Sequence, residues 1–125
     1  MDEIKFTIPL PPRTKKNSSR IVQRGGRHIL LPSKAFLDYQ DKAGYFIPHR
    51  FEKISSPVQV TALFYMDADR VSDLVGHEQA IDDILVHYGV LADDNRKIIV
   101  SHDGSRVLVD RKNPRTEVTI KFLEE

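Results

Sequence analysis

The segment from Ser72 to Asn95 concentrates the residues that could do chemistry. It holds six carboxylates and two histidines, while residues 71–95 contain no lysine or arginine. Mg²⁺ and similar hard cations prefer oxygen ligands, so a divalent metal ion could offset this charge. A metal ion held by several carboxylates could also activate water to hydrolyse a phosphodiester. The carboxylates are Asp73, Glu78, Asp82, Asp83, Asp93 and Asp94.

Asp73 and residues 93–95 also fit purely structural roles. Asp73 stands at the start of a helical pattern, where a carboxylate complements the positive end of the helix dipole. The run Asp93-Asp94-Asn95 is typical of a turn, because Asp and Asn side chains hydrogen-bond to their own backbone. Spacing alone therefore favours a helix cap and a turn over a metal site.

The other polar residues of this segment lie around the helix that its apolar residues predict. His77 falls inside the apolar stripe, where a partly buried structural histidine is commoner than a metal ligand. Glu78 lies at the edge of the stripe and could turn toward a metal or stay a surface charge. Asp82 and Asp83 lie well outside the stripe, so we expect them to be solvated or paired with arginine.

The elements that position these residues follow from apolar periodicity and capping signals. A helix is predicted from Lys34 to about Phe46 with Ser33 as N-cap, and a second helix with Ser72 as N-cap. Gly89 stands where a left-handed C-terminal cap of the second helix is expected. Strands are predicted at residues 4–10, 58–66 and 116–122, a loop or hairpin at 13–27 with a return strand at 28–31, and a hairpin of 97–101 with 106–110 around the turn 102–105.

This order of elements predicts an α/β (α+β) fold with a mixed sheet and two main helices on one face, in a single domain over residues 1–125. Asp73 and the pair Asp93 and Asp94 could then share one sheet edge. A helix of about 16 residues is roughly 24 Å long, however. A shared site therefore needs a long return connection or the partner protomer of a dimer.

Composition excludes several classes of site. The chain has no cysteine, which rules out a disulfide framework, a Cys-based zinc site and a thiol nucleophile. No apolar run approaches the 18 or so residues that span a bilayer, and the N-terminus has no signal-peptide pattern. We therefore expect a cytoplasmic protein without a membrane partner.

Basic residues collect in the first third of the chain. Between Ile4 and Leu37 there are eight basic side chains and no acidic one. A block of one charge sign in a segment punctuated by Gly, Pro and Ser suits a polyphosphate partner, although a solvated loop would show the same pattern. The eight are Lys5, Arg13, Lys15, Lys16, Arg20, Arg24, Arg27 and Lys34.

Several motifs resemble one known family. Pro9 to Pro12 end the first strand before the basic loop, and the strand 58–66 precedes a helix that opens with Asp73. Asp83-Ile-Leu85 lies late in that helix, and a Gly-Val-Leu-Ala-Asp-Asp-Asn run follows at residues 89–95. With the segment 114–120, these features resemble the RusA family of Holliday junction resolvases over nearly the whole chain.

The resemblance implies a homodimer that binds four-way DNA junctions and cuts them with Mg²⁺ or Mn²⁺. It also implies that Asp73 and Asp94 are catalytic metal ligands. The chain departs from the family pattern at three positions. Val75 and Gly76 replace the second Asp and the Asn of the Asp-x-Asp-Asn motif, and Gln79 replaces a helix lysine. The residues that could supply the missing ligand are Glu78, His77, Asp69 and Asp93.

Three functions follow as hypotheses. The first is a Mg²⁺-dependent endodeoxyribonuclease that cleaves Holliday junctions or other branched DNA in recombination and repair. The second is a RusA-like module that binds branched DNA without cutting it, and the third is a phosphate-binding protein that acts on RNA or another substrate. The expected DNA contacts are Lys15, Lys16, Arg20 and Arg106, together with Asn17, for which a turn role is equally expected.

Overall fold

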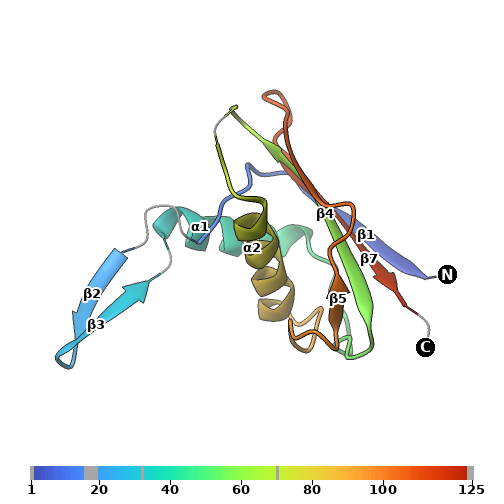
Figure 1. Ribbon diagram of the computed structural model, residues 1–125, viewed down its shortest axis with the longest axis horizontal. Coiled ribbons are helices and arrows are strands. Elements are labelled where there is room, and N and C mark those ends of the chain that lie inside the picture. Colours follow the sequence, from blue (N-terminus) through green and yellow to red (C-terminus); the bar gives the residue numbers. More distant parts are fainter. Residues whose placement is uncertain (1, 16–19, 32, 70, 124–125) are drawn as a thin grey trace.

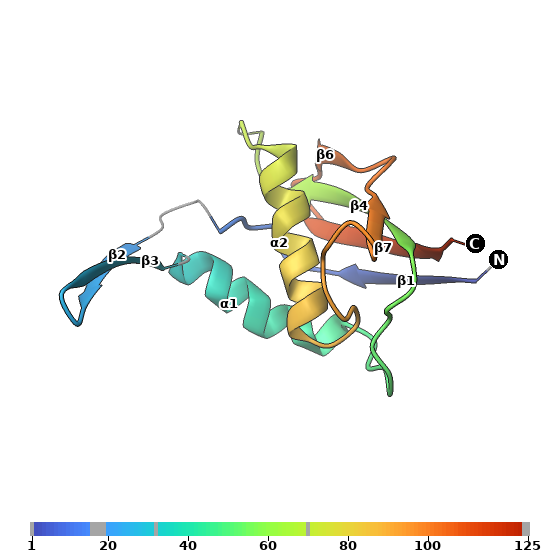
Figure 2. The same ribbon diagram turned by 60° about the horizontal axis from the view of Figure 1, so that its bottom comes forward.

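The structure is a computed structural model that describes residues 2–15, 20–31, 33–69 and 71–123. In these residues the strands form a mixed five-stranded sheet and a separate two-stranded hairpin. Both main helices lie on the same side of the sheet (Figures 1 and 2). The predicted small α+β fold with a mixed sheet and two helices is therefore confirmed. The elements are β1 (Glu3–Ile8), β2 (Arg20–Arg24), β3 (Arg27–Leu31), α1 (Lys34–Ala43), the 3-10 turn η1 (Gly44–Phe46), β4 (Val58–Met66), α2 (Leu74–His87), β5 (Ile99–Ser101), β6 (Arg106–Val109) and β7 (Arg115–Phe122).

Strand β4 is the centre of the sheet. β7 pairs antiparallel with one edge of β4, and β1 pairs antiparallel with β7. β5 and β6 pair parallel with the opposite edge of β4. Burial alternates strictly along β4, as expected for a strand with one face covered. The buried side chains of β4 are Val58, Val60, Ala62, Phe64 and Met66.

The expected hairpin of residues 97–101 with 106–110 is wrong. β5 and β6 do not pair with each other, because both run parallel to β4 along the same edge. Helix α2 carries the chain back to the start of β4, so the chain that follows must run in the direction of β4. Residues 102–105 form the predicted turn, but this turn interrupts an edge strand instead of reversing the chain.

Side chains hold this interruption against β4. The Thr61 hydroxyl donates to the backbone carbonyl of Asp103 at 2.7 Å, and the Ser105 hydroxyl accepts from the backbone N–H of Ala62 at 3.0 Å. These two bonds replace ladder bonds where β5 has ended and β6 has not begun. Gly104 adopts a φ of 86°, a conformation that side-chain-bearing residues rarely accept.

Local capping chemistry sets the helix ends. The Ser33 hydroxyl accepts from the backbone N–H of Phe36 at 3.1 Å, as predicted for the N-cap of α1. The predicted N-cap of α2 is off by one residue, because Asp73 caps the helix by accepting from the backbone N–H of Val75 at 3.2 Å. Ser72 lies within hydrogen-bond distance of a histidine side chain instead.

The C-terminal end of α2 matches the prediction. Gly89 has a φ of 74°, the left-handed conformation expected of a residue that ends a helix. The backbone N–H of Val90 donates to the carbonyl of Leu85 at 2.9 Å, and that of Gly89 donates to Val86 at 3.1 Å. Val90 and Leu85 are both fully buried, so the turn also packs into the core.

One continuous core joins the helices to the sheet. Phe36, Tyr39 and Ala43 of α1 are buried, and the hydroxyl of Tyr39 lies 3.2 Å from that of Thr116 on β7. Helix α2 contributes its own buried row. The described residues include no helix long and apolar enough to cross a membrane. The buried row of α2 comprises Ala80, Ile81, Ile84 and Leu85.

Residues 20–31 form a hairpin, which we call the arm. β2 and β3 pair antiparallel, and Gly25 and Gly26 turn between them with φ values of 55° and 77°. This outcome selects the hairpin over the plain loop at residues 13–27. The arm extends away from the body of the molecule, beyond the start of α1 (Figures 1 and 2).

Two glycines give opposite stability predictions. A Cβ at Gly44 would lie 2.6 Å from the ring of Tyr88, whose hydroxyl donates to the carbonyl of Gln40 at 2.6 Å. We expect Gly44→Ala to push this ring aside and lower the free energy of unfolding by about 1–2 kcal/mol. A Cβ at Gly76, inside α2, would meet nothing closer than 3.6 Å, so Gly76→Ala should raise stability by up to about 1 kcal/mol. Urea unfolding of both variants checks the signs, and a stable Gly44→Ala would contradict the packing described.

Candidate functional site

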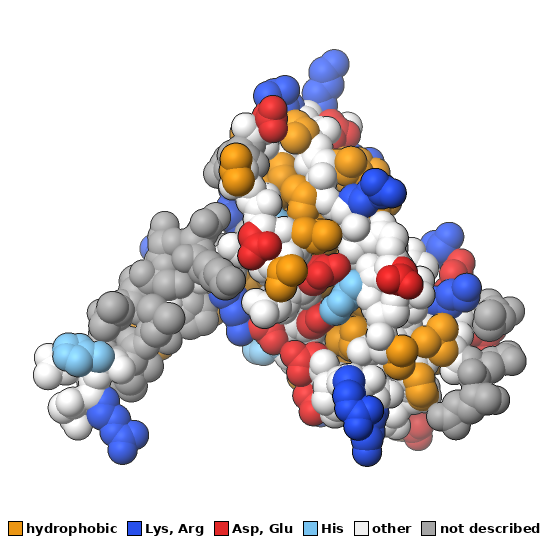
Figure 3. Space-filling view, viewed as in Figure 1, with side chains coloured by type: hydrophobic (Ala, Val, Ile, Leu, Met, Phe, Trp, Pro, Cys, Tyr) orange, Lys and Arg blue, Asp and Glu red, His pale blue; other side chains and the backbone are white. Residues whose placement is uncertain are grey.

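Acidic side chains follow α2 from its start to the loop beyond its end. Asp73 caps the helix, Glu78 and Asp82 lie one turn apart within it, and Asp94 lies in the loop after it. We call these four residues the acidic row, because each interacts electrostatically with the next. Figure 3 shows acidic side chains gathered over α2, with a histidine side chain among them.

Asp82 and His102 form the closest contact along this row. Nε2 of His102 lies 2.8 Å and 3.0 Å from the two carboxylate oxygens of Asp82. His102 follows β5 directly, so the contact joins the sheet edge to the middle of α2. Asp82 is only 7% exposed. The expectation that Asp82 would be solvated or paired with arginine is therefore wrong, because the parallel edge strand covers it and supplies a histidine.

Burial and the neighbouring charges shift three pKa values in this group. Burial raises the pKa of Asp82, although the hydrogen bond with His102 opposes the shift. The hydrogen bond to Asp82 raises the pKa of His102, and the charges of Asp82 and Glu78 add to it against the effect of burial. Burial also raises the pKa of Glu78, and Asp82 and Asp73 add to that shift. His102 is therefore protonated over a wider pH range than a free histidine.

His77 is buried, as the structural interpretation of this residue predicted. It is 1% exposed, and its ring packs on that of Phe64 with 5.0 Å between ring centroids. Nε2 lies 3.2 Å from the Ser72 hydroxyl, and Nδ1 is buried with no hydrogen-bond partner among the described residues. Burial lowers the pKa of His77, so the ring is neutral at physiological pH.

The candidate metal ligands do not meet in one described protomer. Asp73 interacts with Glu78, and Asp94 interacts with Asp82, so the two lie on either side of the middle of α2. The 14 residues of this helix correspond to about 21 Å. In the described part of the chain, no three His, Asp or Glu side chains are placed to hold a metal ion together. A site shared by Asp73 and Asp94 stays a prediction.

Asp93 takes the turn role that spacing favoured. Its carboxylate accepts from the backbone N–H of Asp94 at 2.8 Å and from the side-chain amide of Asn95 at 3.0 Å. Asn95 in turn accepts from the backbone N–H of Lys97 at 2.9 Å. The backbone bond from Asp94 is the main cause that lowers the pKa of Asp93. The turn fixes where the chain leaves α2 for β5.

The predicted DNA contacts are spread over three parts of the fold. Lys15 forms an ion pair with Asp83 of α2, and its ammonium lies 5.9 Å from the centroid of the Phe36 ring. Arg20 is the first residue of β2 in the arm, and Arg106 is the exposed first residue of β6 on the sheet edge. Lys16 and Asn17 lie outside the described residues. Lys15 thus pairs with the acidic helix and is not available as an isolated cation.

Sequence reasoning did not find the pairing of Asp82 with His102. The length of the helix between two strands could have indicated this pairing, since a helical connection of this size is typical of a parallel crossover. A parallel edge strand ending at Ser101 would have brought His102 over the middle of α2. A hairpin of residues 97–110 would not place His102 beside α2, so the hairpin prediction excluded this contact.

The comparisons with known proteins add no relative to this picture. No family model matches the chain, and no curated protein matches its sequence significantly. The resemblance to the RusA family, which is carried by Pro9–Pro12, Asp73 and residues 89–95, stays a prediction.

The raised pKa of His102 predicts how its contribution to stability depends on pH. A raised histidine pKa adds stability below the ordinary value of about 6.5, and this contribution is lost as the pH rises through the folded value. We expect His102→Gln to lower the free energy of unfolding more at about pH 5.5 than at about pH 9. Urea unfolding at both pH values measures this, with the exposed His49→Gln as control. An equal loss at both pH values would contradict the ion pair with Asp82.

Proposed function

We propose that this chain is a homodimeric, Mg²⁺-dependent and structure-selective endodeoxyribonuclease of the RusA type, which cleaves four-way junctions or other branched DNA. The observation that carries the proposal is a basic arm that projects from the same domain whose helix α2 carries the acidic row (Figure 1). The arm contains Arg20, Arg24 and Arg27, and Lys15, which precedes the arm in the sequence, forms an ion pair with Asp83 of α2. DNA contributes closely spaced phosphates, and basic side chains bind them with release of counterions.

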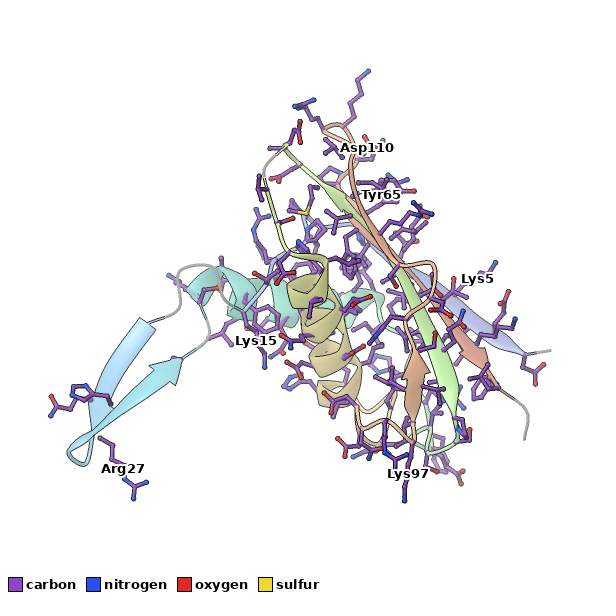
Figure 4. All side chains as sticks on the ribbon, in the orientation of Figure 1. Lys5, Lys15, Arg27, Tyr65, Lys97 and Asp110 are labelled. Carbon is purple, nitrogen blue, oxygen red and sulfur yellow. The ribbon has the colours of Figure 1, made fainter. Side chains whose placement is uncertain are left out.

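The shape of the arm supports a partner of this kind. An isolated two-stranded hairpin is marginally stable in water, and the arm stands away from the main sheet (Figure 1). Figure 4 shows Arg27 at the far end of the arm and Lys15 near its root. A polyphosphate that bound Arg27 at the tip of the arm could therefore extend toward Lys15, which pairs with Asp83 of α2.

Metal binding by Asp73 and Asp94 sets a requirement on the oligomeric state. No three side chains of the described residues in one protomer are placed to hold an ion, so an ion bound by Asp73 and Asp94 calls for ligands from two protomers. The proposed nuclease is a homodimer because two protomers are needed to supply these ligands. When bound, Mg²⁺ would activate water and offset charge on the leaving oxygen.

A second function competes with this proposal. The chain could bind branched DNA without cutting it, as a module that has kept the basic arm. The separation of Asp73 from Asp94, together with Val75 and Gly76 in place of an Asp and an Asn, favours this alternative. Binding and cleavage must therefore be measured separately.

Junction cleavage separates the two functions. We expect the wild type to nick a four-way junction in Mg²⁺, and Asp94→Asn to slow nicking by more than the roughly 10–100-fold typical of a group that only supports a metal ligand. Asp38→Asn, an exposed carboxylate on α1, is the control and should leave the rate unchanged. Gel analysis of the cut strands and band shifts of the uncut junction provide the two readouts. Binding by the wild type without metal-dependent nicking would contradict the nuclease and favour the binding module.

The salt dependence of binding tests the arm independently of cleavage. If Arg27 neutralises one phosphate, Arg27→Gln should reduce the slope of log K against log salt concentration by about 0.9. Lys5 lies on β1, on the opposite side of the molecule from the arm, so Lys5→Gln should leave the slope unchanged (Figure 4). Fluorescence anisotropy of a labelled junction at several salt concentrations measures both slopes. Equal slopes for Arg27→Gln and the wild type would show that the tip of the arm does not contact DNA.

A further inference from the structure

The pairing of His102 with Asp82 leaves one ring nitrogen available. Asp82 engages Nε2 of His102 with both carboxylate oxygens, at 2.8 Å and 3.0 Å, which fixes the plane and the position of the ring. The side chain of His102 is 28% exposed, whereas that of Asp82 is 10% exposed. Both printed side-chain contacts of His102 are made by Nε2, on the Asp82 side of the ring, and the rest of the ring is partly exposed. The ring is therefore held from one side and open on the other.

A purely structural contact with the Asp82 carboxylate would not need a histidine. Burying a carboxylate is costly unless it is paired, and a lysine or arginine would pair with Asp82 at every physiological pH. A histidine instead gains and loses its proton near neutral pH. Glu78 lies one turn before Asp82 on α2, and its charge acts on His102 as well. A ring that is held in place, is partly exposed and keeps its proton more strongly than a free histidine has the properties of a proton donor.

We propose that His102, positioned by Asp82, is the general acid that protonates the leaving oxygen when a phosphodiester is hydrolysed at the acidic row. This inference rests on the nuclease function proposed above. Asp82 and His102 are not among the residues predicted to bind the metal ion. Asp82 is a positioning residue in this scheme, because it acts through the ring of His102.

The proton and electron balance of the step is simple. A water oxygen forms a bond to phosphorus, and the bond from phosphorus to the leaving deoxyribose oxygen breaks. The electron pair of the broken bond goes to that oxygen, which takes the proton from Nδ1 of His102. The attacking water gives one proton to the solvent, and His102 regains one from it. The products are a phosphomonoester and an alcohol.

Substitution of the leaving atom tests this role directly. A sulfur leaving group needs no general acid, because a thiolate is far more stable than an alkoxide. We expect His102→Gln to cleave an ordinary junction about 100-fold or more slowly than the wild type. The same variant should cleave a junction that carries sulfur in place of the leaving oxygen, at the mapped cut site, within a few-fold of the wild-type rate. His49→Gln, an exposed histidine far along the chain from His102, should match the wild type on both substrates.

Asp82→Asn supplies a second variant with a different readout. The hydrogen bond to Asp82 raises the pKa of His102, and the charges of Asp82 and Glu78 act in the same direction. Loss of the Asp82 charge should therefore move the alkaline limb of the pH–rate profile on the ordinary junction to lower pH. The profile on the sulfur-substituted junction should not move. Thermal unfolding of each variant shows whether it is folded under the assay conditions.

The outcomes are distinguishable. Selective rescue of His102→Gln by the sulfur leaving group supports the general acid. Equal loss on both junctions, or no loss on either, overturns the role of His102 and leaves the nuclease proposal standing. If the wild type cleaves neither junction, the nuclease proposal fails and this inference fails with it.

Discussion

The parallel pairing of β4 with the chain that follows α2 is the constraint on which most of the structure depends. A parallel neighbour is reached only when the chain returns along the length of the sheet, and α2 makes this return over the buried face of β4. The helix therefore separates the acids at its two ends. The same geometry brings its middle beside the turn after β5. The distance between Asp73 and Asp94 and the contact of Asp82 with His102 both follow from this one connection.

Three carboxylates of the acidic row, Asp73, Asp82 and Asp94, are stabilised in three different ways. Asp73 caps the backbone N–H of Val75 at the start of α2, where the helix dipole favours negative charge. Asp82 is buried and needs its partner, since a buried carboxylate without one is costly. Asp94 is exposed, and solvent and salt screen its charge. The row thus combines local capping, burial with a partner and hydration, and only the buried member required a residue from another element.

The basic arm lies apart from the sheet and the acidic row. Its two strands pair with each other, and the pair stands outside the main sheet (Figure 1). Lys15, which precedes the arm in the sequence, forms an ion pair with Asp83 of α2. Charge separation of this kind, with cations on a projecting hairpin and carboxylates on the body, favours a ligand that can neutralise the first while approaching the second. That is the physical basis for proposing nucleic acid as the partner.

Features that depend on a few neighbouring residues could be predicted from the sequence. The caps at Ser33 and Gly89 and the strand at residues 58–66 were predicted, because caps and strand patterns are local properties, whereas residues 13–27 stayed open between a loop and a hairpin. The tertiary structure set the direction of β5 and β6, since either direction satisfies their local pattern. It also decided the partner of Asp82, because His102 lies 20 residues away and reaches Asp82 only when the edge strand runs parallel to β4. The cluster of carboxylates at residues 72–95 was therefore visible in the sequence. The pairing of its buried member Asp82 with His102 depends on the tertiary fold.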